Sequence, residues 1–148
     1  TSIRVAGAIT DAEYREFTNS PQPSENGYPG APQYQDVSGE ALPGASKYSF
    51  NIGIDYRVPV FDGKEFHTNL NAQYNSKFNS DNSLSSYGWV DGRTLVDFGI
   101  GIGNSNQTFD VNLVVKNLFD DDTALTRTWN NYTPAHPRWI ALTFSGRF

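Results

Sequence analysis

Apolar and polar side chains alternate along most of the chain with a period of two, which is typical of strands whose faces meet different surroundings. The clearest case is the segment from Lys47 to Arg57, KYSFNIGIDYR, in which every second side chain from Tyr48 to Tyr56 is apolar. The other face carries charged residues, Ser, Asn and Gly. The length of the segment matches the ~9–11 residues that a tilted strand needs to cross a bilayer, so the pattern predicts a membrane-spanning strand.

Five further segments follow the same alternation and predict the other strands of an antiparallel sheet. Four of them are regular, and the fifth, at the start of the chain, turns polar after Ile9 as a strand does when it leaves a membrane for water. The regular segments are Phe66–Asn75, Thr94–Gly103, Thr108–Lys116 and Arg138–Phe148, and the weaker one is Ile3–Phe17.

The connections between these segments alternate in length. The long ones are 18–46, 76–88 and 118–137, and the short ones are 58–65, with a turn at Asp62-Gly63, and 104–107. Outer-membrane barrels alternate long extracellular loops with short periplasmic turns, whereas a soluble sandwich has no reason to do so. We therefore expect both Thr1 and Phe148 on the periplasmic side.

Six strands are fewer than the roughly eight that the smallest such barrels contain. An open sheet would leave two edges in lipid, where each unsatisfied backbone group costs about several kcal/mol. The chain also begins at Thr1 without an initiator Met or a signal peptide. We therefore expect the remaining strands of the barrel to lie outside this chain.

Composition and charge narrow the function classes. The low charged fraction of 18% and the aromatic fraction of 14% fit a barrel, although a soluble β-sandwich or a sugar-binding module would also fit. The net charge of -5 argues against nucleic-acid binding, which needs clustered cations. The absence of Cys excludes disulfides, and two His residues alone predict no zinc site.

No catalytic set is apparent, so we expect neither an enzyme nor a cofactor. The sequence contains no G-x-S-x-G motif and no Ser-His-Asp set that can be placed. The run Asp120–Asp122 is interpreted as a solvated acidic turn rather than a cation site. His67, on the polar face of its segment, and His136, at a loop end, are interpreted as hydrogen-bonding side chains.

The last 33 residues contain KNLFDDD at Lys116–Asp122, then Tyr132–Pro134, then Pro137-Arg138 and a final strand that ends GRF. This arrangement resembles the C-terminus of TonB-dependent outer-membrane receptors. Upstream, Asp36–Ser46 resembles the stretch before a descending strand in the same receptors. The resemblance implies an all-β fold, an antiparallel transmembrane β-barrel of about 22 strands. Residues 1–148 would supply its last six strands, and the plug domain and TonB box are absent from this chain.

The same resemblance implies active uptake of a scarce nutrient, such as a siderophore, cobalamin or a saccharide, across the bacterial outer membrane. The implied partners are outer-membrane lipid, the remaining barrel strands and plug domain, the TonB complex through the missing N-terminal part, and the barrel-assembly machinery. A barrel without transport function, with adhesive or structural loops, is the alternative. A soluble β-sandwich also stays open.

Aromatic residues in the long connections are the candidates for ligand contact, because their rings can stack on ring ligands. The candidates are Tyr28, Tyr34, Trp129 and Tyr132. Tyr87 and Trp89 lie next to a strand end and are assigned to the aromatic girdle instead. Phe144 and Phe148 resemble the C-terminal signal that the barrel-assembly machinery recognises.

Overall fold

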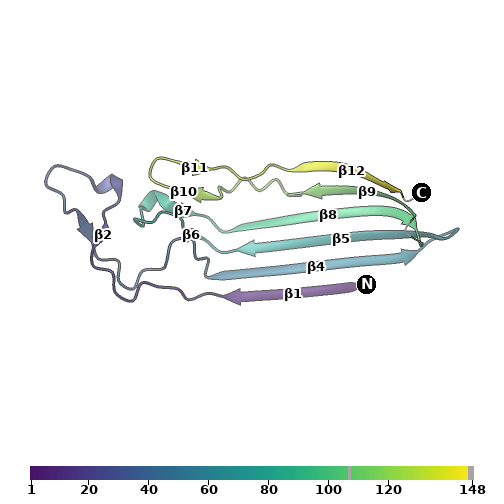
Figure 1. Ribbon diagram of the computed structural model, residues 1–148, viewed down its shortest axis with the longest axis horizontal. Coiled ribbons are helices and arrows are strands. Elements are labelled where there is room, and N and C mark those ends of the chain that lie inside the picture. The colour runs from purple at the N-terminus through teal and green to yellow at the C-terminus, as the bar shows by residue number, and fades with distance from the viewer. Residues whose placement is uncertain (107, 147–148) are drawn as a thin grey trace.

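The computed structural model describes residues 1–106 and 108–146, and its main element is one antiparallel sheet of six long strands in the order β1-β4-β5-β8-β9-β12 (Figure 1). Each long strand therefore lies beside the next long strand along the chain. Their bounds are β1 Ser2–Ile9, β4 Tyr48–Pro59, β5 Lys64–Asn75, β8 Arg93–Asn104, β9 Phe109–Lys116 and β12 Trp139–Gly146.

The long connections contain only short elements, which form three two-stranded ladders beyond one end of the sheet (Figure 1). The pairs are β2 Ser20–Pro21 with β3 Tyr34–Gln35, β6 Phe78–Asn79 with β7 Trp89–Val90, and β10 Thr126–Arg127 with β11 Tyr132–Thr133. Two 3₁₀ turns, η1 Ser24–Asn26 and η2 Ser86–Gly88, complete them.

The register of the five strand pairings joins the predicted apolar faces into one continuous surface. Residues that pair across neighbouring strands lie on the same face of a sheet. One such row crosses the whole sheet through Ile3, Ile54, Leu70, Phe98, Val115 and Ile140. Because every residue of this row has a branched or aromatic side chain, each cross-strand pair stabilises the sheet by about 0.2–1 kcal/mol relative to a pair of alanines. The alternation read from the sequence is thus confirmed on all six strands.

The opposite face is polar and is flattened along β8 by glycine. Gly99, Gly101 and Gly103 alternate on this face, and side chains from the neighbouring strands lean over them. A Cβ placed on Gly101 would lie 2.5 Å from Cε1 of His67 and 2.7 Å from the carbonyl oxygen of Val111. The glycines therefore leave room for polar side chains to lie flat against the backbone.

Long and short connections lie at opposite ends of the sheet, as predicted (Figure 1). The β4–β5 turn uses Asp62 and Gly63 with φ of 43° and 68°, a backbone that the Asp-Gly pair favours in tight hairpins. It is closed by the amide of Lys64, which donates to the Phe61 carbonyl at 2.7 Å. The Ser105 hydroxyl of the β8–β9 turn donates to the Gly63 carbonyl at 2.9 Å and links the two turns.

The first predicted strand, Ile3–Phe17, is too long at its C-terminal end. In the structure β1 ends at Ile9, and the chain continues as a loop with one isolated bridge between Glu13 and Ala41. The residues after Ile9 are mostly polar and no longer alternate with apolar ones, so the pairing of β1 with β4 stops there. Phe148, predicted to belong to the assembly signal, lies outside the described residues, while Phe144 lies on the apolar face opposite Val111.

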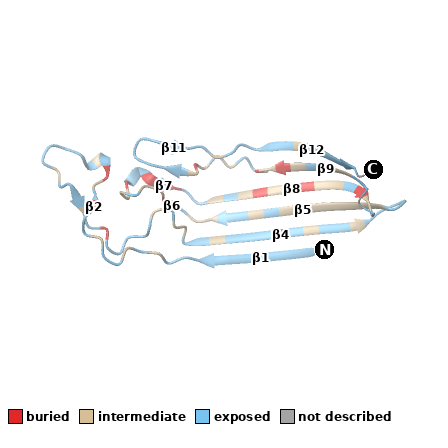
Figure 2. Ribbon diagram, in the orientation of Figure 1, coloured by how far each residue is buried: buried red, intermediate tan, exposed pale blue. Residues whose placement is uncertain are grey.

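The sheet is a single open layer. β1 and β12 form its two edges, and among the described residues no second sheet or long helix covers the apolar face (Figures 1 and 2). Val5 is 72%, Ile54 36% and Phe144 68% exposed. No helix in residues 1–106 and 108–146 is long and apolar enough to cross a membrane.

Exchange of Gly101 for Ala is expected to destabilise the sheet by about 1–3 kcal/mol, because the new Cβ has to displace both a side chain and a backbone carbonyl. Gly53→Ala is the matched control on the same face, since its nearest atom, Oδ1 of Asn71, would lie 3.2 Å away on a side chain. Urea unfolding measures both. Equal losses for the two variants would contradict the close packing over β8.

Candidate functional site

A cavity lies where the first and second long connections meet the end of the sheet. Its volume is about 900 Å³, and Tyr48 of β4 and Tyr74 of β5 are among the residues that line it. Aromatic and charged side chains define its chemistry: Tyr48, Tyr74, Phe78 and Trp89, with Asp36, Glu40, Lys47, Lys77 and Asp91. Such a combination suits a ligand that has both an apolar and a charged part.

Two contacts of aromatic rings involve residues that line this cavity. The rings of Phe50 and Tyr74 stack with their centroids 6.3 Å apart. The ammonium group of Lys77 lies 5.5 Å from the centroid of the Trp89 ring, within the range of a cation–π interaction. Lys77 is therefore held at the cavity wall by an attraction that leaves its N–H donors available to a ligand.

Hydrogen bonds to Glu25 fasten the first long connection to the second. Its Oε1 accepts from the hydroxyl of Ser85 at 2.7 Å, and from the amide and hydroxyl of Ser86 at 2.8 and 3.1 Å. Partial burial works to raise the pKa of the Glu25 carboxyl, but the bonds from Ser85 and Ser86 outweigh it and lower the pKa below its ordinary value. Nearby, the side-chain amide of Gln35 donates to the Ser83 carbonyl at 2.7 Å.

The second long connection is fastened to the third in the same way. The Ser80 hydroxyl donates to the carbonyl of Arg127 at 2.6 Å and accepts from its amide at 2.7 Å. All three long connections are therefore linked by polar contacts into one group at the end of the sheet.

The KNLFDDD motif folds the third connection around Asn117. This residue is only 5% exposed and has a φ of 51°. Its Nδ2 donates to the carbonyls of Asp121 and His136, both at 3.0 Å, and its Oδ1 accepts from the amide of Asp121 at 2.9 Å. Asn tolerates the left-handed conformation and bonds nearby backbone, which explains why it ends strand β9.

The acidic run after Asn117 supports the same fold. Asp120 accepts from the amide of Arg138 at 2.8 Å, just before the last strand. Asp121 accepts from the amide of Thr123 at 2.9 Å; burial acts to raise its pKa, but the bonds from Thr123 and Thr94 lower it below the ordinary value. Asp120 and Asp122 are exposed, as the predicted solvated turn requires, whereas Asp121 is half-buried. Asp120 and Asp121 also accept hydrogen bonds from backbone amides, which the sequence did not predict. Among the described residues no cluster of three or more His, Asp or Glu is placed to hold a metal ion.

The four predicted ligand contacts lie outside this cavity. Tyr28, Tyr34, Trp129 and Tyr132 are all exposed, and none of them lines the cavity. Trp89, assigned to the girdle from the sequence, also lines the cavity, together with Tyr48 and Tyr74. The sequence could have indicated Tyr48 and Tyr74, because each is the last apolar residue at the loop end of its strand.

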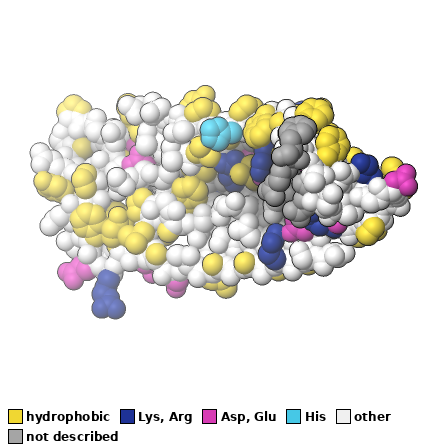
Figure 3. All heavy atoms as spheres, turned by 45° about the vertical axis from the view of Figure 1, so that its right-hand side comes forward, with side chains coloured by type: hydrophobic (Ala, Val, Ile, Leu, Met, Phe, Trp, Pro, Cys, Tyr) yellow, Lys and Arg dark blue, Asp and Glu magenta, His cyan; other side chains and the backbone are white. Residues whose placement is uncertain are grey.

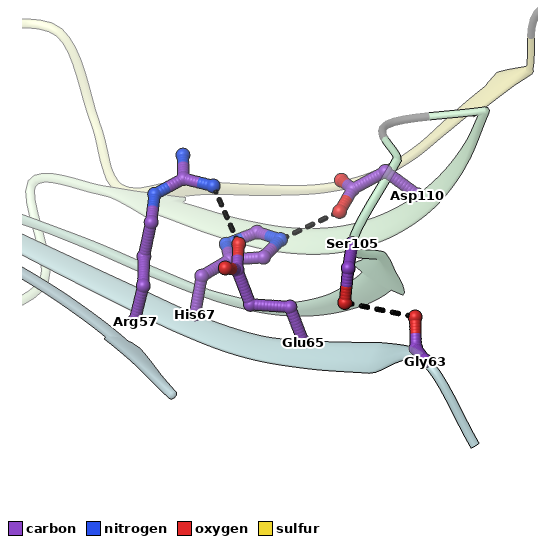
Figure 4. Close-up of polar contacts among 6 residues, drawn as sticks. All are labelled: Arg57, Gly63, Glu65, His67, Ser105 and Asp110. Atoms are coloured by element: carbon purple, nitrogen blue, oxygen red, sulfur yellow. Dashed lines mark hydrogen bonds and ion pairs between the residues drawn. The ribbon is translucent and has the colours of Figure 1, made fainter. Parts of the chain in front are cut away.

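A second cluster of charged side chains lies on the polar face near the short turns (Figure 4). Arg57 and Glu65 form an ion pair at 2.9 Å, and Nε2 of His67 lies 2.6 Å from Oδ2 of Asp110. These residues line a small cavity of about 170 Å³. Because each charge has a partner within the protein, the cluster acts as polar packing, and His67 is the hydrogen-bonding side chain that the sequence predicts.

The visible surface has no large region of one charge. In Figure 3 the Lys and Arg side chains and the Asp and Glu side chains are scattered in small groups of mixed sign.

The chain matches no protein-family model, no curated protein and no solved structure in comparisons with these three groups. The resemblance of its last third to TonB-dependent receptors therefore stays a prediction.

Asn117→Ala is expected to destabilise the protein by about 2–3 kcal/mol, because it removes the side-chain bonds to Asp121 and His136 and strains a left-handed backbone. Asn117→Gly keeps the left-handed backbone conformation accessible and should therefore lose less stability than Asn117→Ala. The midpoint and slope of urea unfolding measure the difference. If Asn117→Ala were as stable as the wild type, the motif would have no role in folding the third connection.

Acidification is expected to release the first connection from the second. A carboxyl with a lowered pKa stabilises the folded state above its ordinary pKa of 4.5, and this contribution is lost as the pH falls through the lowered pKa. Hydrogen exchange of the two connections, corrected for the intrinsic effect of pH, should rise in that range. Glu25→Gln should remove this pH dependence. Glu16→Gln, at an exposed acid between β1 and the first long connection, should leave it unchanged.

Proposed function

We propose that this chain is part of a bacterial outer-membrane receptor for the TonB-dependent active uptake of a scarce nutrient. The observation that carries the proposal is the continuous apolar face of the six-stranded sheet, which no layer of the described residues covers. In water such a face would be an aggregation hazard, because soluble monomers rarely expose large contiguous apolar patches. Lipid is a solvent in which the same face is stable.

The strand dimensions support a membrane location. The three longest strands have 12 residues each. At about 3.3 Å per residue such a strand is roughly 40 Å long, and a tilt of about 45° reduces its span to about 28 Å. This matches the ~30 Å hydrocarbon thickness of a bilayer.

Aromatic side chains at the two ends of β4 support it further. Tyr48 begins the apolar face of this strand, and Tyr56 lies near its other end, before Val58; both tyrosines are partly exposed. Tyr rings favour the boundary between lipid and water, because the ring is apolar and the hydroxyl needs a hydrogen-bond partner.

The two edges of the sheet favour a larger barrel. β1 and β12 each expose one side of their backbone ladder, which lipid cannot satisfy. Further strands between these edges would satisfy both and would enclose the polar face with its glycines and ion pairs. The same arrangement would present the three connected loops on one side of the membrane.

Uptake is favoured over an adhesive or structural role by the resemblance of the KNLFDDD segment and the final strand to TonB-dependent receptors. The exposed aromatic residues of the loops remain candidates for contact with the nutrient. The proposed partners are outer-membrane lipid, the other barrel strands with the plug domain, and the TonB and barrel-assembly machineries.

Ile54→Lys is expected to reduce the stability of the membrane-inserted protein by about 2–4 kcal/mol, because it places a charge at mid-height on the proposed lipid face. Asn51→Lys is the matched control on the polar face of the same strand. Urea unfolding in phospholipid vesicles measures both variants. Equal stability of the two, or recovery of the wild type from the aqueous fraction without detergent, would refute the membrane location.

Transport itself is tested in cells. A bacterium that expresses the complete protein should lose energy-dependent uptake of one nutrient when the gene is deleted, and equally when TonB is removed. Loss of surface adhesion without loss of any uptake would favour the adhesive alternative.

A further inference from the structure

We propose that the transported nutrient is a neutral oligosaccharide, which binds to the polar face of the sheet with Trp139 as its stacking residue. The inference rests on the proposed function, in which this face lines the interior of the barrel. It selects the saccharide among the nutrients that such a receptor takes up.

The carboxylates that the described strands place on the polar face already have basic partners. Two of these pairs are drawn in Figure 4. The partners are Asp55 with Arg4 at 2.6 Å, Glu65 with Arg57 at 2.9 Å, Asp97 with Lys116 at 2.7 Å, and Asp110 with Nε2 of His67 at 2.6 Å. A charged ligand would have to compete with these internal partners, whereas a neutral ligand would leave them in place. The face therefore favours an uncharged nutrient over a negatively charged ferric siderophore.

Uncharged amide side chains are the groups that this face offers to a ligand. Four of them are exposed on β4 and β5: Asn51, Asn69, Asn71 and Gln73. Asn51 lies directly opposite Gln73 in the pairing of the two strands. The hydrogen bonds between side chains of this face are made by other residues, and none of the four amides has a partner in the described part of the chain. An amide both donates and accepts, which suits hydroxyl groups because they do the same.

Glycines hold two of these amides close to the backbone. Oδ1 of Asn71 lies 3.2 Å from the position that a Cβ on Gly53 would take, and the side chain of Asn69 lies over Gly99. Larger residues at the two glycine positions would push both amides outward. The amides therefore lie flat, and the space above this part of the sheet stays open to a ligand.

Trp139 supplies the apolar surface that a sugar ring needs. It pairs with Lys116, which places its side chain on the polar face, and it is 50% exposed. Within the described strands it is the only Phe, Tyr or Trp on this face. The C–H groups of a pyranose ring pack against an aromatic ring, while the hydroxyls at its rim remain available to polar groups.

The register brings Trp139 and the amides into one row at the loop end of the sheet. Asn71 pairs with Asp97, the ion pair joins Asp97 to Lys116, and Lys116 pairs with Trp139. Asn71 and Trp139 are therefore three strand spacings apart, about 14 Å. A ligand of several sugar rings would stack on Trp139 with one ring and reach the amides with another.

An oligosaccharide array tests the class of the nutrient. The detergent-solubilised full-length polypeptide that contains this chain is applied to neutral gluco-, galacto-, xylo- and manno-oligosaccharides, to oligosaccharides of uronic acids, and to a negatively charged triscatecholate ferric siderophore. The wild type should bind at least one neutral oligosaccharide, and bind it more tightly than the acidic probes. Tighter binding of an acidic probe, or binding of no neutral oligosaccharide, would overturn the proposal.

Variants on the two faces of β12 test the site. Trp139→Ala should weaken the affinity for the bound neutral oligosaccharide by about tenfold or more, because the stacking surface is lost, and Trp139→Phe should restore most of it. Leu142→Ala is the matched control, since Leu142 is an exposed residue on the opposite face of the same strand. If Trp139→Ala lowered the thermal stability but left the affinity unchanged, Trp139 would pack against another part of the polypeptide, and the site would be refuted.

The outcomes separate this inference from the proposed function. A polypeptide that inserts into vesicles and supports TonB-dependent uptake of a siderophore instead of a saccharide would refute the inference alone. Recovery of the wild type from the aqueous fraction without detergent would refute the membrane location, whatever the array shows.

Discussion

The missing second layer over the apolar face is the constraint on which the rest of the structure depends. A sheet in a soluble domain buries its apolar face against another sheet or against helices. Here the face runs unbroken from β1 to β12, and among the described residues nothing lies over it. Of the five buried apolar residues in the described part of the chain, three, Val37, Val90 and Ala124, lie outside the large sheet. The protein interior therefore contributes little to holding the strands together. The sheet is held mainly by its ladders and by cross-strand pairs.

The loops follow from the same constraint. With no apolar layer to pack against, they are organised by polar side chains that bind backbone groups. Asn117 folds the third connection, Glu25 joins the first to the second, and Ser80 joins the second to the third. Bonds of this kind are directional, so they fix the position of a loop more than they add to stability. The result is a defined surface at one end of the sheet, with the cavity between the first two connections.

The features that could be predicted from the sequence are those that depend on neighbouring residues within one strand or turn. Period two identified the six long strands and their faces, and Asp62-Gly63 identified a tight turn, because these signals are local. What depends on contacts between distant segments was missed. Nothing in the residues around Glu25 indicates that its carboxyl binds Ser85. The sequence also does not distinguish the exposed Tyr28 and Tyr34 from the tyrosines that line the cavity. The role of Gly101 also needed the pairing of β5 with β8, because only the register places His67 over it.

The edges of the sheet determine what any completing strand has to look like. β1 runs from the short-turn end toward the loops, and β12 runs back, so strands inserted between them in an alternating series can pair antiparallel with both (Figure 1). Paired residues share a face, so a strand beside β12 has to place apolar side chains opposite Ile140 and Leu142, and a strand beside β1 has to do so opposite Ile3 and Val5. A slip of one residue would turn polar side chains toward the apolar surrounding on every added strand. If further strands complete this sheet, as proposed, the alternation seen in these six strands has to extend through them in the same register.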